Sequence, residues 1–294
     1  MDIDEAVAVL KKSPDHHVIT RMVERSEYNA PDGTETKLGI VLDVETTGLN
    51  SDTDEIIELA LLPFRFSADG RIFEVLDALD QLQEPTSGKV PPEITRITGI
   101  TTKMVQGQNI NTQDVMDMVA PAALIIAHNA NFDRKFVEKA FPVFSTKAWA
   151  CSMKEIPWRE EGFEGVKLEY LALKSGFFYN PHRAEVDCRA TLELLSRPLS
   201  HSGELGLASL LKNARKMTHR IWAENAPFDF KDVLKSRGYR WNAGNNGKPR
   251  SWYVDVSEDN LNDELSYLKS EIYQREADIP VTRFGPFDRY SERV

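Results

Sequence analysis

The sequence predicts an α/β fold in which helices flank a mixed sheet, followed by a small α+β module. Three strand patterns follow one another between residues 38 and 76. From Pro92 onward, helical periodicity alternates with a short apolar strand at Leu124–Ala127. Strands first, and then alternating helix and strand, are typical of a mixed sheet covered by helices. A break at residues 198–203 separates this part from shorter helices and strands.

Each element of the predicted sheet has a pattern of its own. Leu38–Val44 is a nearly continuous apolar run with β-branched residues, which is typical of a buried central strand. A turn at Ala68–Gly70 joins the next two strand patterns, Ile56–Phe66 and Arg71–Leu76, into a hairpin. Apolar spacing predicts the helices that follow, at 115–119, 132–141, 168–175 and 184–195.

Beyond residue 205 the sequence predicts a module that mixes helices and strands. The expected helices are 205–223, 228–237 and 260–276, and the expected strands are 239–242 and 251–256. On the first helix Lys212, Lys216 and Arg220 recur at every fourth position, which predicts a basic stripe. The stripe fits a nucleic-acid contact, and it fits an ordinary solvated helix face equally well. Most tryptophans of the module, Trp222, Trp241 and Trp252, are expected in its core.

Composition limits the classes of protein that this chain can be. It has 294 residues, of which 41% are hydrophobic and 28% charged, as in globular proteins. The pattern suggests a polar lead-in at 1–36 with a helix at 5–12 and an edge strand at 17–23, then domains at 37–198 and 205–294. No apolar run is long enough to span a membrane, and the N-terminus does not resemble a secretory signal. Two cysteines exclude a disulfide scaffold, so we expect a cytoplasmic protein.

Charge is distributed unevenly along the chain. The net charge is −10, but residues 205–250 contain ten Lys and Arg and only three acidic residues. An acidic first part and a locally basic segment fit a carboxylate-lined metal site beside a surface that binds phosphates. A chance fluctuation of local charge explains the same numbers, and composition alone does not separate the two.

Acidic residues follow the first buried strand. Asp43 and Glu45 are two residues apart at its end, so both carboxylates point to the same face. Two like charges there are costly unless a cation pairs with them, and oxygen ligands suit Mg²⁺ or Mn²⁺. The pair alone is weak evidence, because a solvated strand end explains most such pairs. The residues that follow, Thr46–Leu49, include a glycine that lets a ligand approach the main chain.

Two later segments carry further candidates. Asp133 lies in the opening turn of a helix after the polar turn that contains Asn129, and the helix dipole alone accounts for an acid there. His182 precedes another helix, and Asp187 lies in its first turns. A single histidine in such a place is more often structural than functional. A purely structural role explains each segment alone, but it does not readily explain why the segments of Asp43, Asp133 and Asp187 occur together in this order and spacing.

Taken together, these segments resemble the DEDDh exonuclease superfamily, also called DnaQ-like, within the ribonuclease H-like fold. The matching motifs are Asp43-x-Glu45 with Thr-Thr-Gly-Leu, Asn129-x-x-Phe132-Asp133, and His182-x-x-x-x-Asp187. Pro-Glu-Ile-Thr-Arg-Ile-Thr-Gly-Ile at 92–100 and Lys-Leu-Glu-Tyr-Leu-Ala at 167–172 resemble two further stretches of the family. The resemblance covers about 37–198, and no catalytic position in it is substituted.

The resemblance implies a metal-dependent 3′–5′ exonuclease that hydrolyses phosphodiester bonds by a two-metal mechanism. Two Mg²⁺ or Mn²⁺ ions are expected on Asp43, Glu45, Asp133 and Asp187, with His182 as the general base. The resemblance also implies that the terminal nucleotide is held by Thr46, Leu49, Asn129 and Phe132. The expected partner is nucleic acid with a free 3′ end, and DNA is slightly preferred over RNA.

Other functions remain open from the sequence. One alternative is an exoribonuclease or short-oligonucleotide nuclease of the same fold, because discrimination between DNA and RNA rests on contacts to the 2′-hydroxyl. A second is a proofreading or binding subunit associated with a polymerase or repair partner. A third is a nucleic-acid-binding module with an inactive site, which the intact motifs disfavour. The sequence indicates neither an oligomeric state nor a role for residues 1–36.

Overall fold

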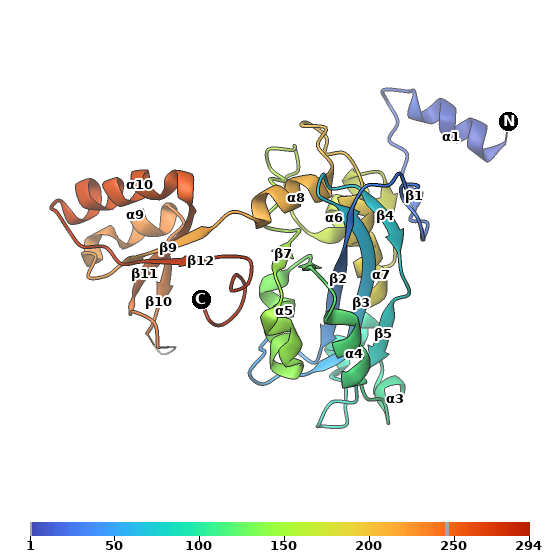
Figure 1. Cartoon of the computed structure of the whole chain (residues 1–294), viewed down its shortest axis with the longest axis horizontal. Helices are drawn as coiled ribbons and strands as arrows, with labels where there is room; N and C mark the ends of the chain where they lie inside the picture. The colour runs from blue at the N-terminus through green and yellow to red at the C-terminus, as the bar shows by residue number, and fades with distance from the viewer. Residues whose placement is uncertain (1, 245–246) are drawn as a thin grey trace. The chain divides into compact units, whose positions relative to one another are not determined.

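The computed structural model describes residues 2–244 and 247–294 of the chain. They form two compact units (Figure 1). The first comprises Met1–Ala214 and the short segment Tyr290–Arg293, and the second comprises Arg215–Arg289 with Val294. The predicted limits of 37–198 and 205–294 stay predictions. Helix α8 (Gly206–Ala214) belongs to the first unit, where its leucines Leu207, Leu210 and Leu211 are buried in the core.

A mixed sheet forms the centre of the first unit, as the sequence predicts. Its strands are β2 (Thr36–Thr46), β3 (Ile56–Ser67), β4 (Ile72–Val75), β5 (Leu79–Leu82), β6 (Leu124–Ala127) and β7 (Trp149–Cys151). They run in the order β4-β3-β2-β6-β7, with β5 also paired to β3. The first strands pair antiparallel, whereas β2 pairs parallel with β6 and β6 parallel with β7.

Strand β2 lies inside the sheet and is covered on both faces. Ile40 and Leu42 belong to one buried cluster and Val41 to the other. Because neighbouring residues point to opposite faces, a strand covered on both faces is apolar throughout rather than at alternate positions. This explains the continuous apolar run from which the strand is predicted.

Helices cover the two faces of the sheet. The cluster that contains Ile40 includes residues of α4 (Thr112–Val119), α5 (Ala130–Ala140) and η1 (Pro142–Thr146). The cluster that contains Val41 includes residues of α6 (Leu168–Lys174), α7 (Ala184–Leu195) and α8. Between β5 and α4 lie the short helices α2 (Pro92–Thr98) and α3 (Thr102–Val105). A mixed sheet between helical layers is the ribonuclease H-like arrangement that the sequence predicts.

The N-terminal segment contains a helix and a very short strand. Helix α1 (Ile3–Lys11) begins with a capping box between Asp2 and Glu5, which confirms the predicted helix with a start slightly earlier. Strand β1 (Thr20–Arg21) pairs parallel with β8 (Phe177–Phe178) in a separate two-stranded sheet. Among the helices of the described residues, none combines the length and the apolar character that crossing a membrane requires.

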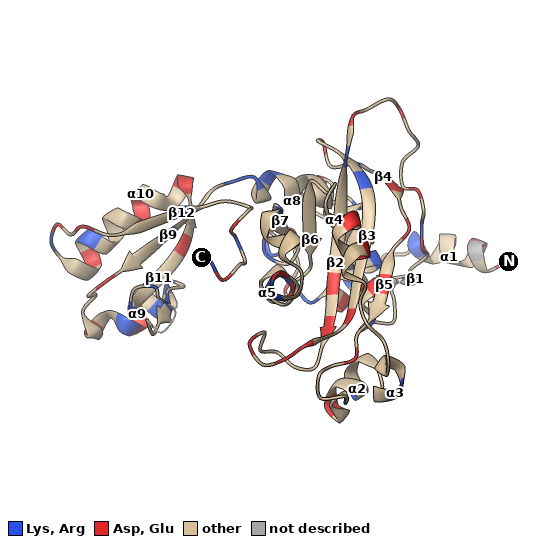
Figure 2. Ribbon diagram, turned by 60° about the horizontal axis from the view of Figure 1, so that its bottom comes forward, with Lys and Arg blue, Asp and Glu red and all other residues tan. Residues whose placement is uncertain are grey.

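The second unit is a four-stranded antiparallel sheet with helices, which confirms the predicted α+β class. The sheet order is β10-β11-β9-β12, from β9 (Thr218–Ala223), β10 (Arg240–Asn242), β11 (Ser251–Ser257) and β12 (Val281–Phe284). The helices are η2 (Phe228–Phe230), α9 (Lys231–Ser236), α10 (Glu258–Tyr267) and η3 (Leu268–Tyr273). Figure 2 shows acidic residues on α10 and basic residues on α9.

The predicted helix at 205–223 is wrong in its second half. It ends at Ala214, and Thr218–Ala223 forms strand β9 between β11 and β12. Thr218, Ile221 and Trp222 are β-branched or aromatic, which favours a strand when neighbouring strands are present to pair. The predicted basic stripe is therefore wrong as well, because Arg220 lies on a strand and forms an ion pair with Asp255 at 2.6 Å.

Candidate active site

The end of β2 places two carboxylates on one side of the sheet. Asp43 lies opposite Ala60 of β3, and Glu45 lies opposite Glu58. The register shifts between Glu45 and Thr46, so the regular ladder ends where the loop begins. Both carboxylates come from the strand end at which the sequence predicts them.

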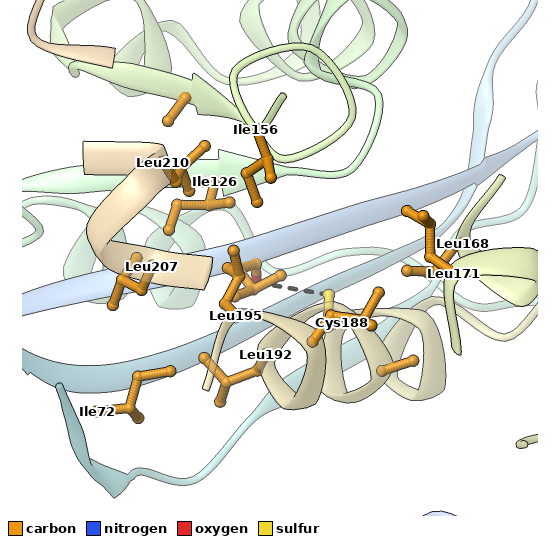
Figure 3. Close-up of a cluster of buried hydrophobic side chains, with 14 of the residues drawn as sticks. Ile72, Ile126, Ile156, Leu168, Leu171, Cys188, Leu192, Leu195, Leu207 and Leu210 are labelled. Carbon is orange, nitrogen blue, oxygen red and sulfur yellow. Dashed lines mark hydrogen bonds between the residues drawn. The ribbon is translucent and has the colours of Figure 1, made fainter. Parts of the chain in front are cut away.

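Helix α7 brings a third carboxylate to the first two. Oxygen atoms of Asp43, Glu45 and Asp187 all lie within 4.8 Å of one another, and we call these three residues the carboxylate cluster. Asp187 lies in the first turn of α7, whose position is set by its packing on the sheet. Figure 3 shows Cys188, Leu192 and Leu195 of this helix among the buried side chains of that packing.

Asp133 lies beside the cluster at the start of α5. Its side chain is only 2% exposed, and its carboxylate accepts hydrogen bonds from its own N–H and from the N–H of Val44 on β2. Val44 stands between Asp43 and Glu45, so this bond fixes the start of α5 against the strand that carries them. All four predicted acidic residues thus converge from three separate elements.

The acidic groups of the site raise one another's pKa values. Burial, followed by the charges of Asp133 and Asp187, raises the pKa of Asp43 well above its usual range. Burial and the charge of Asp187 raise the pKa of Glu45 to about 8, and burial is also the main cause that raises the pKa of Asp133 to about 7. The pKa of Asp187 is raised by burial as well, against the opposing effect of its hydrogen bonds.

The donor set fits a divalent cation. Buried or half-buried carboxylates this close together repel one another, and a bound cation removes that repulsion. The donors are oxygen atoms, which are the ligands that Mg²⁺, Mn²⁺ and Ca²⁺ prefer, whereas zinc sites usually include nitrogen or sulfur.

The loop before α7 holds His182 in an unusual backbone conformation. His182 has a φ of 67°, in the left-handed region that non-glycine residues rarely adopt. Its N–H donates a hydrogen bond to the Asp187 carboxylate at 2.7 Å, and the hydroxyl of Tyr179 donates to the other Asp187 oxygen at 2.9 Å. The His182 side chain is exposed. The carboxylate that joins the cluster therefore also fixes the main chain of the loop.

The sequence did not predict an ion pair beside the site between a buried carboxylate, Glu58, and a half-exposed guanidinium, Arg183. Glu58 is fully buried and accepts hydrogen bonds from the side chain of Arg183 and the N–H of Ala184, the first residue of α7. A signal was present, because Glu58 is the one acidic residue in the apolar run Ile56–Phe66. Its partner could not be named from the sequence.

The residues predicted to hold a nucleotide lie on the same chain segments as Glu45 and Asp133. Leu49 is 86% exposed in the loop after β2, and Asn129 is exposed at the start of α5. Phe132 is half-buried, with its ring centroid 4.9 Å from that of Phe136. Thr46 is buried, and its hydroxyl donates to the carbonyl oxygen of Gly48 at 2.5 Å. A Cβ at Gly48 would lie 2.6 Å from the Asp54 carboxylate, so a side chain there would displace that carboxylate from its hydrogen bond with the N–H of Asn50.

Comparison with known proteins agrees with this geometry. The family model RNase_T, described as exonuclease, matches residues 40–195, which is more than half of the chain. DNA polymerase III PolC-type of Clostridium perfringens is 32% identical over 167 residues, which cover 53% of this chain and 11% of that polymerase. DNA polymerase III subunit epsilon of Treponema pallidum is 29% identical over 168 residues, which cover 54% of this chain and 75% of that subunit.

A solved structure shares the fold. The zinc-bound complex of E. coli ExoI with single-stranded DNA has a TM-score of 0.51 at 14% identity, covering 81% of this chain and 71% of that one. The likeness supports the mixed sheet flanked by helices. The family model, the polymerase relatives and the three motifs on this fold lead to one conclusion: the chain belongs to the exonuclease family, in the DEDDh (DnaQ-like) superfamily that its sequence resembles.

Proposed function

We propose that the protein is a metal-dependent 3′–5′ exonuclease that removes nucleotides from the 3′ end of DNA. The observation that carries the proposal is the approach of Asp43, Glu45 and Asp187 to within 4.8 Å, in a chain of the exonuclease family. Members of this family depend on divalent metal ions. The raised pKa values of the cluster support the same assignment, because these carboxylates need a cation to be ionised together.

Two ions, Mg²⁺ or Mn²⁺, would be held by Asp43, Glu45, Asp133 and Asp187. When bound, such ions supply Lewis acidity that promotes attack by water and stabilises charge on the departing oxygen. The chain contributes by fixing its ligands beforehand. The bonds from Val44 to Asp133 and from Tyr179 to Asp187 restrain two of the four carboxylates.

His182 would act as the general base. Its ring nitrogen would accept the proton of the attacking water, since imidazole is the side chain that most readily changes charge near neutral pH. The hydrogen bond from its N–H to Asp187 supports this role by holding its backbone next to the cluster. The exposure of the side chain lets the proton pass on to solvent after each turnover.

Thr46, Leu49, Asn129 and Phe132 would hold the terminal nucleotide. Leu49 and Asn129 are exposed, so an apolar and an amide side chain are available to a base or sugar. DNA is the substrate we favour, because two relatives are named as parts of DNA polymerases and the ExoI structure contains single-stranded DNA. RNA is the alternative substrate, and the gel assay described next compares the two polymers.

The test is a gel assay on single-stranded DNA and RNA labelled at either end. The reactions contain Mg²⁺, Mn²⁺ or EDTA. We expect a ladder that shortens from the 3′ end only with a metal, and faster with DNA than with RNA. Intact DNA and RNA in every metal reaction would reject the proposal, and faster loss of RNA would identify an exoribonuclease.

A polymerase-associated role is the second candidate. The observation that favours it is the match to a polymerase subunit over 75% of that subunit's length. Affinity purification with the tagged full chain, followed by identification of stoichiometric partners, tests it. Co-purification of a DNA polymerase would support proofreading, whereas recovery of the chain alone with full activity would support a free-standing nuclease.

A further inference from the structure

One tryptophan of the second unit is unusually exposed. Trp241 on β10 is 50% exposed, whereas the other tryptophans are buried or half-buried. Its ring packs edge-on against Trp252 of β11, with centroids 5.6 Å apart, so the side chain is held in place rather than free to turn away. Tryptophan is buried to a high degree on average, and a fixed, half-exposed ring is therefore available for contact with a partner.

Trp241 lies in the most basic segment of the chain. Residues 233–254 contain five Lys and Arg and no Asp or Glu. Four of the five are exposed, among them Lys235 on α9, Arg237 just after it and Arg250 immediately before β11. The fourth is Arg240, next to Trp241. We call Lys235, Arg240, Trp241 and Arg250 the hairpin surface.

Acidic residues compensate part of this positive charge. Arg237 pairs with Glu264 of α10 at 2.9 Å and is therefore not counted in the hairpin surface. Arg240 pairs with Asp255 at 3.0 Å, but Asp255 is shared with Arg220 at 2.6 Å, so one carboxylate faces two guanidinium groups. Three other acidic residues, Glu258, Asp259 and Asp263, belong to α10, a helix on which Figure 2 shows acidic residues. A polyanion is therefore the partner that charge complementarity favours.

Strand β10 is also an edge of its sheet, since it pairs with β11 alone in the order β10-β11-β9-β12. Successive side chains of a strand point to opposite faces of the sheet, so Arg240 points to one face and Trp241 to the other, and both are accessible at the edge. A single-stranded nucleic acid offers the two groups that such an edge can bind, a phosphate backbone for the cations and base faces for the indole. Duplex DNA has its base faces stacked and fits the tryptophan poorly.

We propose that the hairpin surface binds single-stranded nucleic acid, as a contact for the substrate strand separate from the carboxylate cluster. The proposal rests on the proposed exonuclease function and adds a second contact to it. Both contacts belong to one chain, so a long strand held by the hairpin surface is kept at a raised effective concentration near the cluster. A substrate of one nucleotide gains nothing from the second contact. Substitutions in the hairpin surface should therefore raise KM for long strands and leave the hydrolysis rate of a one-nucleotide substrate unchanged.

The test compares full-length variants on two substrates. The variants are Trp241→Ala and the double variant Lys235→Glu with Arg250→Glu. A charge-matched control, Lys269→Glu with Arg275→Glu, changes the same number of charges beyond α10. The substrates are the p-nitrophenyl ester of thymidine 5′-monophosphate and an oligothymidylate of about 30 nucleotides, long enough for a site of several nucleotides. Thermal melts verify that each variant is folded, and fluorescence anisotropy measures binding of the same oligonucleotide in EDTA.

We expect both hairpin variants to hydrolyse the ester at the normal rate, with KM and Kd for the oligonucleotide raised about tenfold. The double variant should also have a salt dependence shallower by about 1.4 in log Kd against log salt, from two lost phosphate contacts on a single strand. Oligonucleotide affinities equal to those of the control variant would overturn the proposal. If the wild-type chain hydrolyses neither substrate, the exonuclease function fails, while anisotropy still decides whether the hairpin surface binds.

Discussion

The guanidinium of Arg183 donates two hydrogen bonds to one oxygen of the buried Glu58 carboxylate, from Nε at 2.9 Å and from Nη2 at 2.6 Å. The other oxygen of Glu58 accepts the N–H of Ala184 at 3.0 Å. Glu58 also lies opposite Glu45 in the ladder between β3 and β2. One buried carboxylate therefore connects the strand beside the cluster to the first residue of the helix that carries Asp187.

This ion pair predicts that removing the side chain of Arg183 lowers the free energy of unfolding more than removing the charge of Glu58. Arg183→Met leaves a fully buried carboxylate without its cation, which costs about 3–5 kcal/mol of unfolding free energy. Glu58→Gln should cost less, because the Arg183 side chain is 42% exposed and can turn to water. Urea unfolding of both variants gives the comparison, with Arg65→Met as a control whose ion pair is exposed. An equal or smaller loss for Arg183→Met would contradict the prediction.

Removing one carboxylate of the cluster should abolish hydrolysis and leave the fold intact. In Asp187→Ala the site loses a metal ligand, while the loss of one of three repelling charges offsets the lost hydrogen bonds from Tyr179 and His182. The gel assay and a thermal melt of the same sample check both parts. Glu185→Ala, in the same helical turn, is the control and should remain active. Full activity of Asp187→Ala with Mg²⁺ would refute the four-carboxylate site.

His182→Ala should lower the rate by about 10²–10⁴-fold, the usual contribution of a general base. The main-chain bond from residue 182 to Asp187 remains in this variant, so metal binding should be preserved. The measurement is kcat over a pH series, with His17→Ala as an exposed-histidine control. A kcat and pH profile identical to those of the wild type would remove His182 from the mechanism.

The metal-free protein should lose stability as the pH rises from 6.5 to 8. Folding raises the pKa of Glu45 to about 8 and that of Asp133 to about 7, so the folded state binds protons that the unfolded state has released. Burial lowers the pKa of His128 to about 4, which opposes this trend only below about pH 6.5. Urea unfolding in EDTA should show the decline, and saturating Mg²⁺ should flatten it. The same slope with and without Mg²⁺ would argue against a metal at these carboxylates.

Much of the fold could be read from local patterns. The strand Leu124–Ala127 and the helix Ala184–Leu195 begin and end where the sequence predicts, because each is an apolar pattern bounded by polar or turn residues. Of the four acidic residues that the family resemblance singles out, the structure brings three to within 4.8 Å of one another, and Asp133 lies at the start of α5, hydrogen-bonded to Val44. The roles proposed for them, and for the nucleotide-binding residues, stay predictions.

The features that sequence reasoning missed depend on distant partners. Glu58 and Arg183 are separated by 125 positions, and nothing local to either residue names the other. Thr218–Ala223 continues a helical pattern, but it becomes a strand because β11 and β12 pair with it on both sides. Strand β7 has only three residues, too few for a periodic signal.

The cluster takes its carboxylates from β2 and from α7, the last of the elements that meet there. Helix α7 also covers β2 and β3, so the sheet lacks that layer until residue 195 has been synthesised. A chain still emerging from the ribosome thus carries Asp43 and Glu45 without the group that completes them. The group of carboxylates proposed to bind metal is therefore complete only after the last helix of the site has been made and has packed on the sheet.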